Sequence, residues 1–163
     1  MKLQPYVRPI LLGLLLILID AFVLNQGVLA GLVVLVQLVL GIPGIIRANS
    51  PDIKRVRLVS LAIYIGAALI VFSSNLVNNR IAHHRAEVLI SSIKAYVSAE
   101  HKYPEKLQDL VPRYIPSVPD AKFSLMFNKF YYSSKHPFLM YVSFSPFARP
   151  TYSFDKETWQ VVD

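Results

Sequence analysis

Three apolar runs fill most of the first 77 residues, and each is long enough to cross a lipid bilayer as a helix. They are Pro9 to Leu24, Val28 to Ile46 and Leu58 to Val77. A hydrocarbon core of about 30 Å needs roughly 20 helical residues. The sequence therefore predicts a membrane anchor of three transmembrane helices in residues 1–77, followed by a separate head in residues 78–163.

The first run has a competing interpretation, a cleaved signal peptide, because a basic lead precedes a short apolar core. However, no A-x-A cleavage site follows the run, and Asp20 interrupts its core. The second run also begins almost at once, after the tight turn Asn25-Gln26-Gly27. We therefore expect the first run to be retained as a helix.

The basic residues around the runs predict how the anchor is oriented. Short cytoplasmic segments of membrane proteins carry an excess of Lys and Arg. The N-terminus and the loop after the second run hold all six basic residues of the anchor, which are Lys2, Arg8, Arg47, Lys54, Arg55 and Arg57. The turn between the first two runs is uncharged. We therefore expect the N-terminus and the basic loop to be cytoplasmic and the head to lie on the opposite side.

The net charge of +7 is high enough to consider nucleic-acid binding, but its distribution argues against that class. In the head, eleven basic and eight acidic groups are interspersed, whereas a nucleic-acid binder shows a basic stripe or a known motif. The chain has no cysteine, which excludes disulfides, thiolate metal ligands and cysteine nucleophiles. It also has no catalytic motif and no phosphate-binding glycine pattern, so we expect neither an enzyme nor a cofactor.

A helical stripe of apolar residues opens the head. Its members recur at the 3.6-residue period of a helix and are Ala82, Ala86, Leu89, Ile90, Ile93, Tyr96 and Val97. The helix continues from the third run and should end near His101, because Pro104 pushes Tyr103 out of the helical region. Such a stripe needs a partner surface, which we expect from the aromatic segment that begins at Phe123.

The rest of the head predicts a short helix and a small sheet. Pro104 to Val111 has a proline in its first turn, where helices tolerate it. Four aromatic and β-branched runs separated by turn-forming clusters follow, namely Phe130–Tyr132, Phe138–Phe144, Thr151–Phe154 and Trp159–Val162. They predict an antiparallel meander of three or four strands whose apolar face covers the stripe. The expected fold class is an α+β membrane protein.

The junction between the helix and the sheet resembles a known family. A long helix continuous with a membrane span, the motif K-Y-P-x-x-L-x-x-L-V-P and a small meander resemble the head of bacterial pseudopilins and related pilin-like proteins. The resemblance covers about Leu58 to Val162 and rests on Tyr96, Tyr103, Pro104, Leu107, Leu110, Val111, Pro112 and the segment from Tyr152 to Trp159. It implies a bacterial inner-membrane protein with a periplasmic head that contacts secretion or pilus-type envelope partners.

The chain departs from that family in one respect. Secreted pilins begin with a short leader that is cut before a Phe with a Glu nearby, and nothing similar precedes Leu58. Two further apolar runs lie upstream instead. We therefore expect a pilin-like head fixed to the membrane, acting as an interaction protein and not as a filament subunit.

The first two predicted spans contain one polar residue each, Asp20 and Gln37. A carboxylate within the bilayer is costly and usually faces a partner or a wet cavity, and Gln37 at a comparable depth offers it a hydrogen bond. One interpretation is a proton or ion relay, or a subunit contact, in a small accessory subunit of a transport or electron-transfer complex. The other is that the span ends early and Asp20 lies near the headgroups beside Asn25. We favour the second, because transport needs several such groups.

A weak metal candidate follows the third run. His83 and Glu87 are four residues apart on the helix, and His84 and Glu87 are three apart, so either pair suits one metal ion. A third ligand would have to be His101 or His136. The same residues fit a polar collar where the helix leaves the bilayer, and we favour this collar over a metal-assisted hydrolase.

Overall fold

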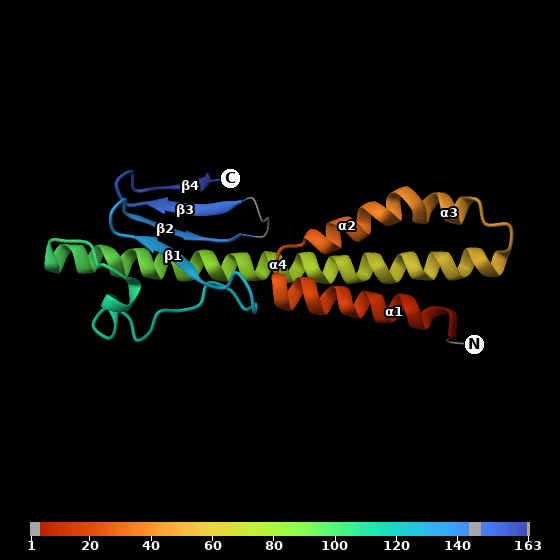
Figure 1. Ribbon diagram of the computed structural model, residues 1–163, viewed down its shortest axis with the longest axis horizontal. Coiled ribbons are helices and arrows are strands. Elements are labelled where there is room, and N and C mark those ends of the chain that lie inside the picture. The colour runs from red at the N-terminus through yellow and green to blue at the C-terminus, as the bar shows by residue number, and fades with distance from the viewer. Residues whose placement is uncertain (1–3, 144–147, 163) are drawn as a thin grey trace. The chain divides into compact units, whose positions relative to one another are not determined.

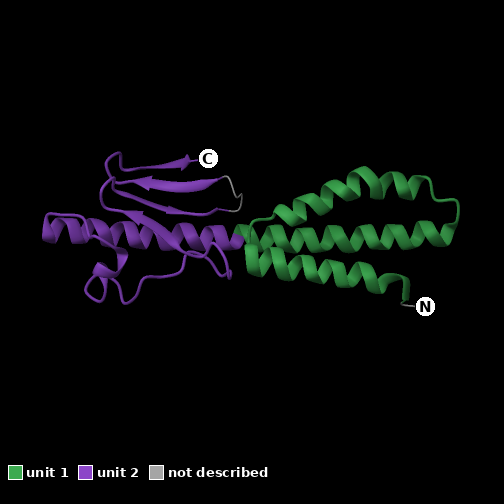
Figure 2. Ribbon diagram, viewed as in Figure 1, with its two compact units in different colours: residues 1–76 green, residues 77–163 purple. Residues whose placement is uncertain are grey.

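The computed structural model describes residues 4–143 and 148–162. The chain divides into two compact units, Met1–Leu76 and Val77–Asp163, which Figure 2 shows in green and purple. We call them the N-terminal unit and the head. The last residue of the predicted run Phe138–Phe144 lies outside the described residues.

The N-terminal unit consists of three helical segments (Figure 1). The first joins an α-helix to a π-helix, the second has a π-helix between two α-helices, and the third is the beginning of a long α-helix. In chain order the elements are α1 (Gln4–Leu16), η1 (Ile17–Leu24), α2 (Val28–Val36), η2 (Gln37–Gly41), α3 (Ile42–Ile46) and α4 (Pro51–Glu100).

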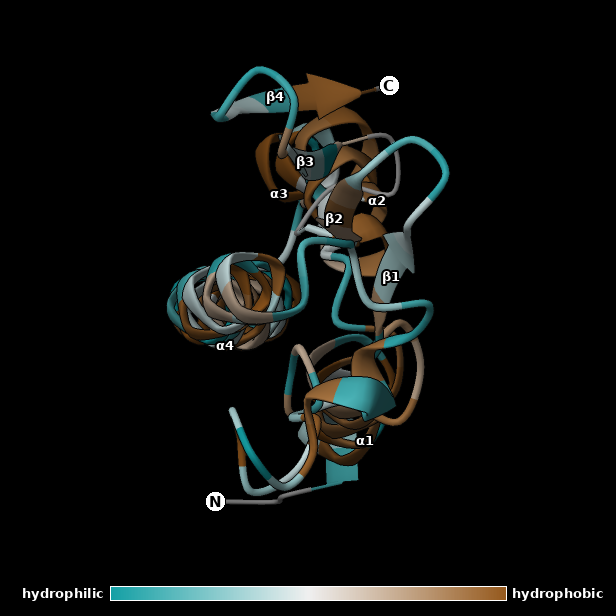
Figure 3. Cartoon of the chain, turned by 90° about the vertical axis from the view of Figure 1, so that its left-hand side faces the viewer, coloured by the Kyte–Doolittle hydropathy of each residue, from teal (hydrophilic) through white to brown (hydrophobic). Residues whose placement is uncertain are grey.

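All three segments are long and apolar enough to cross a membrane, as judged by length and composition, over Gln4–Leu24, Val28–Ile46 and Pro51–Glu100. Their large apolar side chains mostly point outward, and α2 and α3 are predominantly brown in Figure 3. Leu40 and Ile46, for example, are 68% and 75% exposed. Contiguous apolar surface of this extent is unusual on a monomer in water.

The core of the N-terminal unit combines Leu16 and Val71 with several small side chains, which let helices approach closely. Its almost completely buried members include Ala21, Ala30, Ala67 and Ala68. Gly13 makes a tight contact, because a Cβ atom at that position would lie 3.2 Å from Cγ2 of Ile63. Gly31 and Gly66 have open space beside them, so only some of the small residues in the spans act in packing.

Helix α4 runs without a break from Pro51 to Glu100, and therefore includes both the third predicted span and the predicted amphipathic helix. Its start corrects the prediction that residues 47–57 form a loop. Pro51 fits the first turn of a helix, where its missing N–H has no helical acceptor to lose. The predicted end near His101 is confirmed, since His101 adopts a φ of 55° directly after the last helical residue.

After α4 the chain forms a single 3-10 turn, η3 (Leu107–Leu110). The predicted helix over Pro104–Val111 is therefore too long. Oδ2 of Asp109 accepts hydrogen bonds from the backbone N–H groups of Glu105 and Lys106, at 3.0 and 3.1 Å. This local side-chain capping satisfies both donors without a longer helix.

The four strands form one antiparallel sheet in the order β1-β2-β3-β4, which confirms the predicted meander. The strands are β1 (Phe130–Ser133), β2 (Phe138–Tyr141), β3 (Arg149–Ser153) and β4 (Thr158–Val162). The register places Tyr132 opposite Leu139, Leu139 opposite Tyr152, and Tyr152 opposite Trp159. Residues directly opposite one another project from the same side of a sheet, so these four share one face.

The apolar stripe of α4 belongs to the same core as this face of the sheet, as predicted. The aromatic segment expected to cover the stripe was placed too early in the chain, because the large apolar side chains of Phe123–Phe127 are exposed and lie outside this core. The most buried members of the stripe are at most 4% exposed and are Ala82, Ala86, Leu89, Ile90 and Ile93. Tyr96 and Val97 are partly buried against them. Leu139, Tyr141 and Tyr152 contribute the side of the sheet to the cluster. The head is therefore an α+β unit with one hydrophobic core.

Candidate functional site

Asp20 lies in η1, is fully buried, and caps the start of the second helical segment. Its Oδ1 accepts a hydrogen bond from the backbone N–H of Gly27, and its Oδ2 accepts one from the N–H of Ala30, both at 2.9 Å. The first N–H groups of a helix have no partner within the helix, and a carboxylate there also meets the positive end of the helix dipole. The geometry gives Asp20 a structural role at the turn.

No hydrogen bond joins Gln37 to Asp20 within residues 4–143 and 148–162. Gln37 begins η2 and lines an apolar groove of about 410 Å³ that also includes Tyr64 of α4. The remaining lining comes from Leu, Ile and Val side chains of the first two helical segments. The structure therefore does not join Asp20 and Gln37, the polar residues of the first two predicted spans, into the relay that the sequence left open.

His83 and Glu87 come together with Trp159 of β4. The indole Nε1–H of Trp159 donates a hydrogen bond to Oε1 of Glu87 at 2.8 Å. The rings of His83 and Trp159 lie with centroids 4.9 Å apart, and Nε2 of His83 is 3.7 Å from Oε1 of Glu87. The three side chains connect α4 to the last strand.

The described residues, 4–143 and 148–162, contain no group of three or more His, Asp or Glu side chains placed to hold a metal ion. His84 is exposed on α4, His101 follows the end of that helix, and His136 lies in the turn between β1 and β2. Neither of the last two supplies the third ligand that the metal hypothesis required. The carboxylate of Glu87 is engaged by the indole of Trp159.

Most of the residues that carry the pilin-like resemblance pack in or beside the core of the head, whereas Val111 and Pro112 are exposed. The packed residues include Tyr96, Tyr103, Pro104, Leu107, Leu110 and Trp159. The hydroxyl of Tyr132 donates a hydrogen bond to the carbonyl of Pro104 at 2.9 Å, and the rings of Tyr103 and Phe154 have centroids 5.8 Å apart. These contacts tie the Tyr-Pro junction to the sheet, so the motif shapes the fold and offers little surface for recognition.

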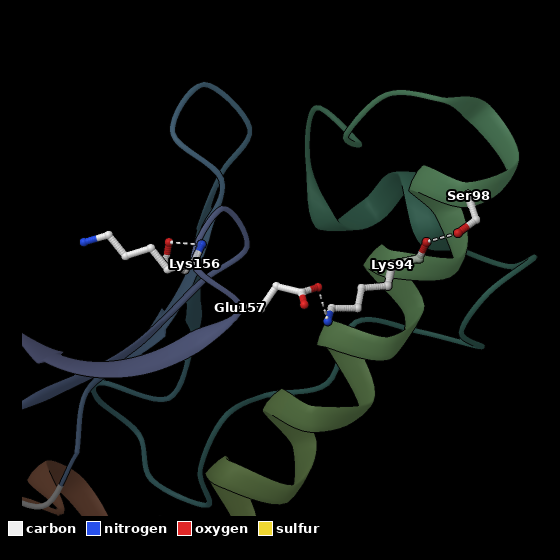
Figure 4. Close-up of polar contacts among 5 residues, drawn as sticks. Lys94, Ser98, Lys156 and Glu157 are labelled. Atoms are coloured by element: carbon white, nitrogen blue, oxygen red, sulfur yellow. Dashed lines mark hydrogen bonds and ion pairs between the residues drawn. The ribbon is translucent and has the colours of Figure 1, made fainter.

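A cleft of about 260 Å³ is lined by residues of α4 and of the β3–β4 turn, with Tyr103 and Phe154 as its aromatic wall. Lys94 Nζ and Glu157 Oε1 form an exposed ion pair there at 2.8 Å (Figure 4). The hydrogen bond from Lys94 lowers the pKa of Glu157, and the same bond raises the pKa of Lys94. Both groups therefore stay charged near neutral pH, where neither acts as a general acid or base.

Lys122 is a buried cation that the sequence did not reveal. Its side chain is 1% exposed, and Nζ donates a hydrogen bond to the carbonyl of Ser143 at 2.9 Å. Burial lowers the pKa of this ammonium to about 8. Lysine is almost always a surface residue, and the neighbours Ala121 and Phe123 carry no pattern that would mark this one as buried.

Two exposed apolar surfaces of the head were also missed. One is the end of β4, where Val161 and Val162 are 65% and 47% exposed and the strand is brown in Figure 3. The other is the segment Phe123–Phe127, in which four of five residues are large, apolar and exposed. Contiguous exposed apolar groups mark sites of interaction with proteins or membranes, so these surfaces are the candidate functional sites of the head.

Comparison with protein-family models, with curated proteins and with solved structures finds no match to this chain. The pilin-like resemblance therefore stays a prediction that rests on the sequence motif. What the chain does must be argued from its own geometry: three apolar helical segments, a small α+β head and two exposed apolar surfaces on that head.

Proposed function

We propose that this chain is an interaction protein, fixed by three helices in a bacterial inner membrane, whose periplasmic head binds an envelope protein of secretion or pilus type. The open edge of β4 is the observation that carries the binding role. Helix α4 supports the anchored arrangement, because one uninterrupted helix contains the third apolar segment and then the buried stripe of the head.

The basic residues at the start of α4 support the orientation. Lys54 and Arg55 are exposed in the first turns of the helix, and Arg57 donates a hydrogen bond to the carbonyl of Gly44. Cations at a helix N-terminus interact unfavourably with the helix dipole, so we infer that another interaction offsets this cost. Attraction to anionic lipid headgroups on the cytoplasmic side provides one.

The edge of β4 supports binding to an extended peptide segment. Within residues 4–143 and 148–162, β4 pairs with β3 alone, so its outer row of backbone N–H and C=O groups has no strand beside it. Native proteins usually protect such an edge with charges, proline or a bulge. Thr158–Val162 contains no charged residue and no proline. A partner strand would extend the sheet by main-chain hydrogen bonds and would cover Val161 and Val162.

Two reporter fusions after Asp163 test the orientation. A reporter that is active only outside the cytoplasm should be active there, and one that is active only in the cytoplasm should be silent. The opposite pattern would overturn the proposed arrangement.

A pull-down from membranes in mild detergent tests the binding role. With an affinity tag at the N-terminus, the unaltered chain should recover secretion or pilus-type envelope proteins, identified by mass spectrometry. Val161→Lys should lose them, because a charge on the edge strand disfavours strand addition. Val88→Lys is the matched control, since it places the same charge on an exposed valine of α4 and should bind normally. Equal recovery with both variants would rule out the β4 edge as the binding site.

The alternative function is an accessory subunit of a membrane transport or electron-transfer complex. The geometry favours the interaction role over it, because both carboxylate oxygens of Asp20 already accept backbone hydrogen bonds. Recovery of a transporter or redox complex in the same pull-down would reverse this preference.

A further inference from the structure

We propose that the segment Phe123–Phe127, the apolar loop, inserts into the headgroup region of the outer leaflet of the bilayer and seats the head on the membrane. This inference rests on the proposed function, since it requires that the three helices span a membrane. It adds a second membrane contact, made by the head itself.

The apolar loop is held in shape by its own hydrogen bonds. The backbone N–H of Ala121 donates to the carbonyl of Asn128 at 2.6 Å, which closes the base of the loop. Within it, the hydroxyl of Ser124 donates to the carbonyl of Met126 at 2.8 Å, and Phe127 adopts a φ of 56°. The tip is therefore shaped before any contact, which lowers the entropy lost on binding.

The side chains at the tip are exposed to an extent that water does not favour. Phe123 is 63% exposed, Leu125 is 77%, Met126 is 48% and Phe127 is 41%. Elsewhere in the head, large apolar side chains are concentrated in the core that α4 forms with the sheet. A cluster of Phe, Leu and Met at one tip is the composition of segments that lie in the membrane interface.

Asn78 fixes where the apolar loop lies within the head. Its Oδ1 accepts a hydrogen bond from the backbone N–H of Phe123 at 3.0 Å, and its Nδ2 donates to the carbonyl of Phe123 at 3.3 Å. Asn78 follows directly on Val77, the last residue of the predicted third span. Because the loop is tied to the first turn of α4 after that span, it lies at the end of the head where the helix enters the bilayer. This position favours contact of the apolar loop with lipid over contact with a soluble protein.

A cation in contact with the apolar loop suits the same environment. The guanidinium of Arg85 lies 4.5 Å from the ring centroid of Phe123 and donates a hydrogen bond to the carbonyl of Asp120 at 2.7 Å. Arg80 is exposed one turn nearer to the span. Arginine beside aromatic residues is typical of the boundary between hydrocarbon and headgroups, where phosphates are available.

Site-directed fluorescence on the full chain tests this proposal, because the chain has no native cysteine. Three single-cysteine variants carry an environment-sensitive label: Leu125→Cys at the loop tip, Leu69→Cys in α4 of the N-terminal unit, and Ala99→Cys near the end of α4. Ala99 is exposed and lies about 30 Å along the helix from Asn78 at 1.5 Å per residue. Each variant is placed in phosphatidylethanolamine–phosphatidylglycerol nanodiscs that contain spin-labelled lipid. The emission of Trp159 verifies that the head is folded.

The expected result is a blue-shifted label at Leu125→Cys that is quenched most by a spin label near the headgroup. The label at Leu69→Cys should be quenched most by a spin label deep in the acyl chains, and the label at Ala99→Cys by neither. If Leu69→Cys is quenched and Leu125→Cys stays in water, the loop proposal fails while the anchor stands. If Leu69→Cys is not quenched, the anchor fails and the loop proposal with it. A blue shift at Leu125→Cys without quenching indicates a protein contact, which also overturns the proposal.

Discussion

The N-terminal unit and the head are held together by different forces. In the N-terminal unit, most large apolar side chains face outward and the core is formed by four alanines together with Leu16 and Val71. In the head, the core is formed by large aliphatic and aromatic side chains of α4 and the sheet. In the proposed arrangement the helices of the N-terminal unit are surrounded by lipid and gain little from burying apolar groups, so close packing and hydrogen bonds hold them. Burial of apolar surface from water holds the head.

Among the described residues, each unit also buries one acidic or basic side chain, and the hydrogen bonds of the two differ. Asp20 is 0% exposed and accepts hydrogen bonds from two backbone N–H groups at a helix start. Lys122 is 1% exposed and donates to the carbonyl of Ser143. A buried charge is tolerated only when it is paired or hydrogen-bonded. The comparison therefore predicts that Asp20 stabilises its turn while charged Lys122 destabilises the head.

The largest expected effect comes from the core of the head. Leu89→Ala removes a fully buried side chain, and such truncations cost about 2 to 5 kcal/mol because a cavity remains. The single tryptophan, Trp159, belongs to the head and makes its fluorescence a probe of that unit alone. Denaturant unfolding of the full chain in detergent, followed by this fluorescence, should show a large fall in the midpoint.

The matched control is Leu69→Ala, which truncates a leucine that is 61% exposed in the N-terminal unit. It should leave the Trp159 transition where it was, since lipid or detergent covers that side chain equally well after truncation. A comparable loss from both variants would mean that the two units do not differ in the way described above.

The second effect is a pH dependence in the head that arises from Lys122. Its pKa falls from 10.5 to about 8 on folding, so between these values the unfolded chain binds more protons than the folded one. Stability should therefore rise with pH across this window, by on the order of 3 kcal/mol at about 1.4 kcal/mol per pKa unit. Lys122→Met should remove the rise. Parallel pH profiles of the two proteins, measured by denaturant unfolding, would contradict the assignment.

Two tyrosines of the head set the upper limit of that window. Burial raises the pKa of Tyr132 and of Tyr141 from 10.0 to about 12. Because their folded pKa values lie above the unfolded ones, stability is lost as the pH rises from 10 towards 12. Since the Lys122 contribution rises from about pH 8 and the tyrosine contributions fall above pH 10, the stability of the head should be greatest near pH 10.

The third effect should appear in the N-terminal unit. Asp20→Asn keeps the size of the side chain but replaces one carboxylate oxygen by an NH2 group. The oxygens of Asp20 accept hydrogen bonds from the backbone N–H groups of Gly27 and Ala30, so one of these two donors loses its acceptor in the variant. A buried donor left without its acceptor costs about 1 to 3 kcal/mol. The variant should lower the thermal stability of the helical signal in circular dichroism and leave the Trp159 transition unchanged. An unchanged helical signal would show that the carboxylate is not needed for the turn.

Features with a sequence period were predictable. The stripe from Ala82 to Val97 follows from the period of a helix, and its place in the core of the head was confirmed. The four strands were predicted from aromatic and β-branched runs between turn-forming clusters, and the antiparallel meander was also confirmed. The start of α4 was missed because Lys54, Arg55 and Arg57 look like a loop, although polar residues are compatible with a helix. Charge composition alone did not separate the two.

Features that depend on contacts distant in sequence were not predictable. The burial of Lys122 depends on Ser143, and the position of the apolar loop depends on Asn78, 45 residues earlier. The bonds that Asp20 makes depend on how tightly the turn at Gly27 closes. In each case the residue type was ordinary, and the three-dimensional surroundings gave it its role.

The smallest expected effect comes from the ion pair between Lys94 and Glu157, which sharpens the contrast between buried and exposed charges. Both side chains are substantially exposed, and exposed pairs gain little because water and salt screen them. The pKa of Glu157 is lowered, so the stability that the pair contributes is lost in acid as this carboxylate is protonated. The pKa of Lys94 is raised, so the same contribution is lost in strong base as the ammonium group is deprotonated. Glu157→Gln should therefore leave the Trp159 unfolding midpoint unchanged at physiological salt, and any small loss at low salt should vanish when salt is added. If Glu157→Gln lowers the unfolding midpoint at neutral pH and added salt does not remove the loss, the pair behaves as a buried ion pair and the prediction is wrong.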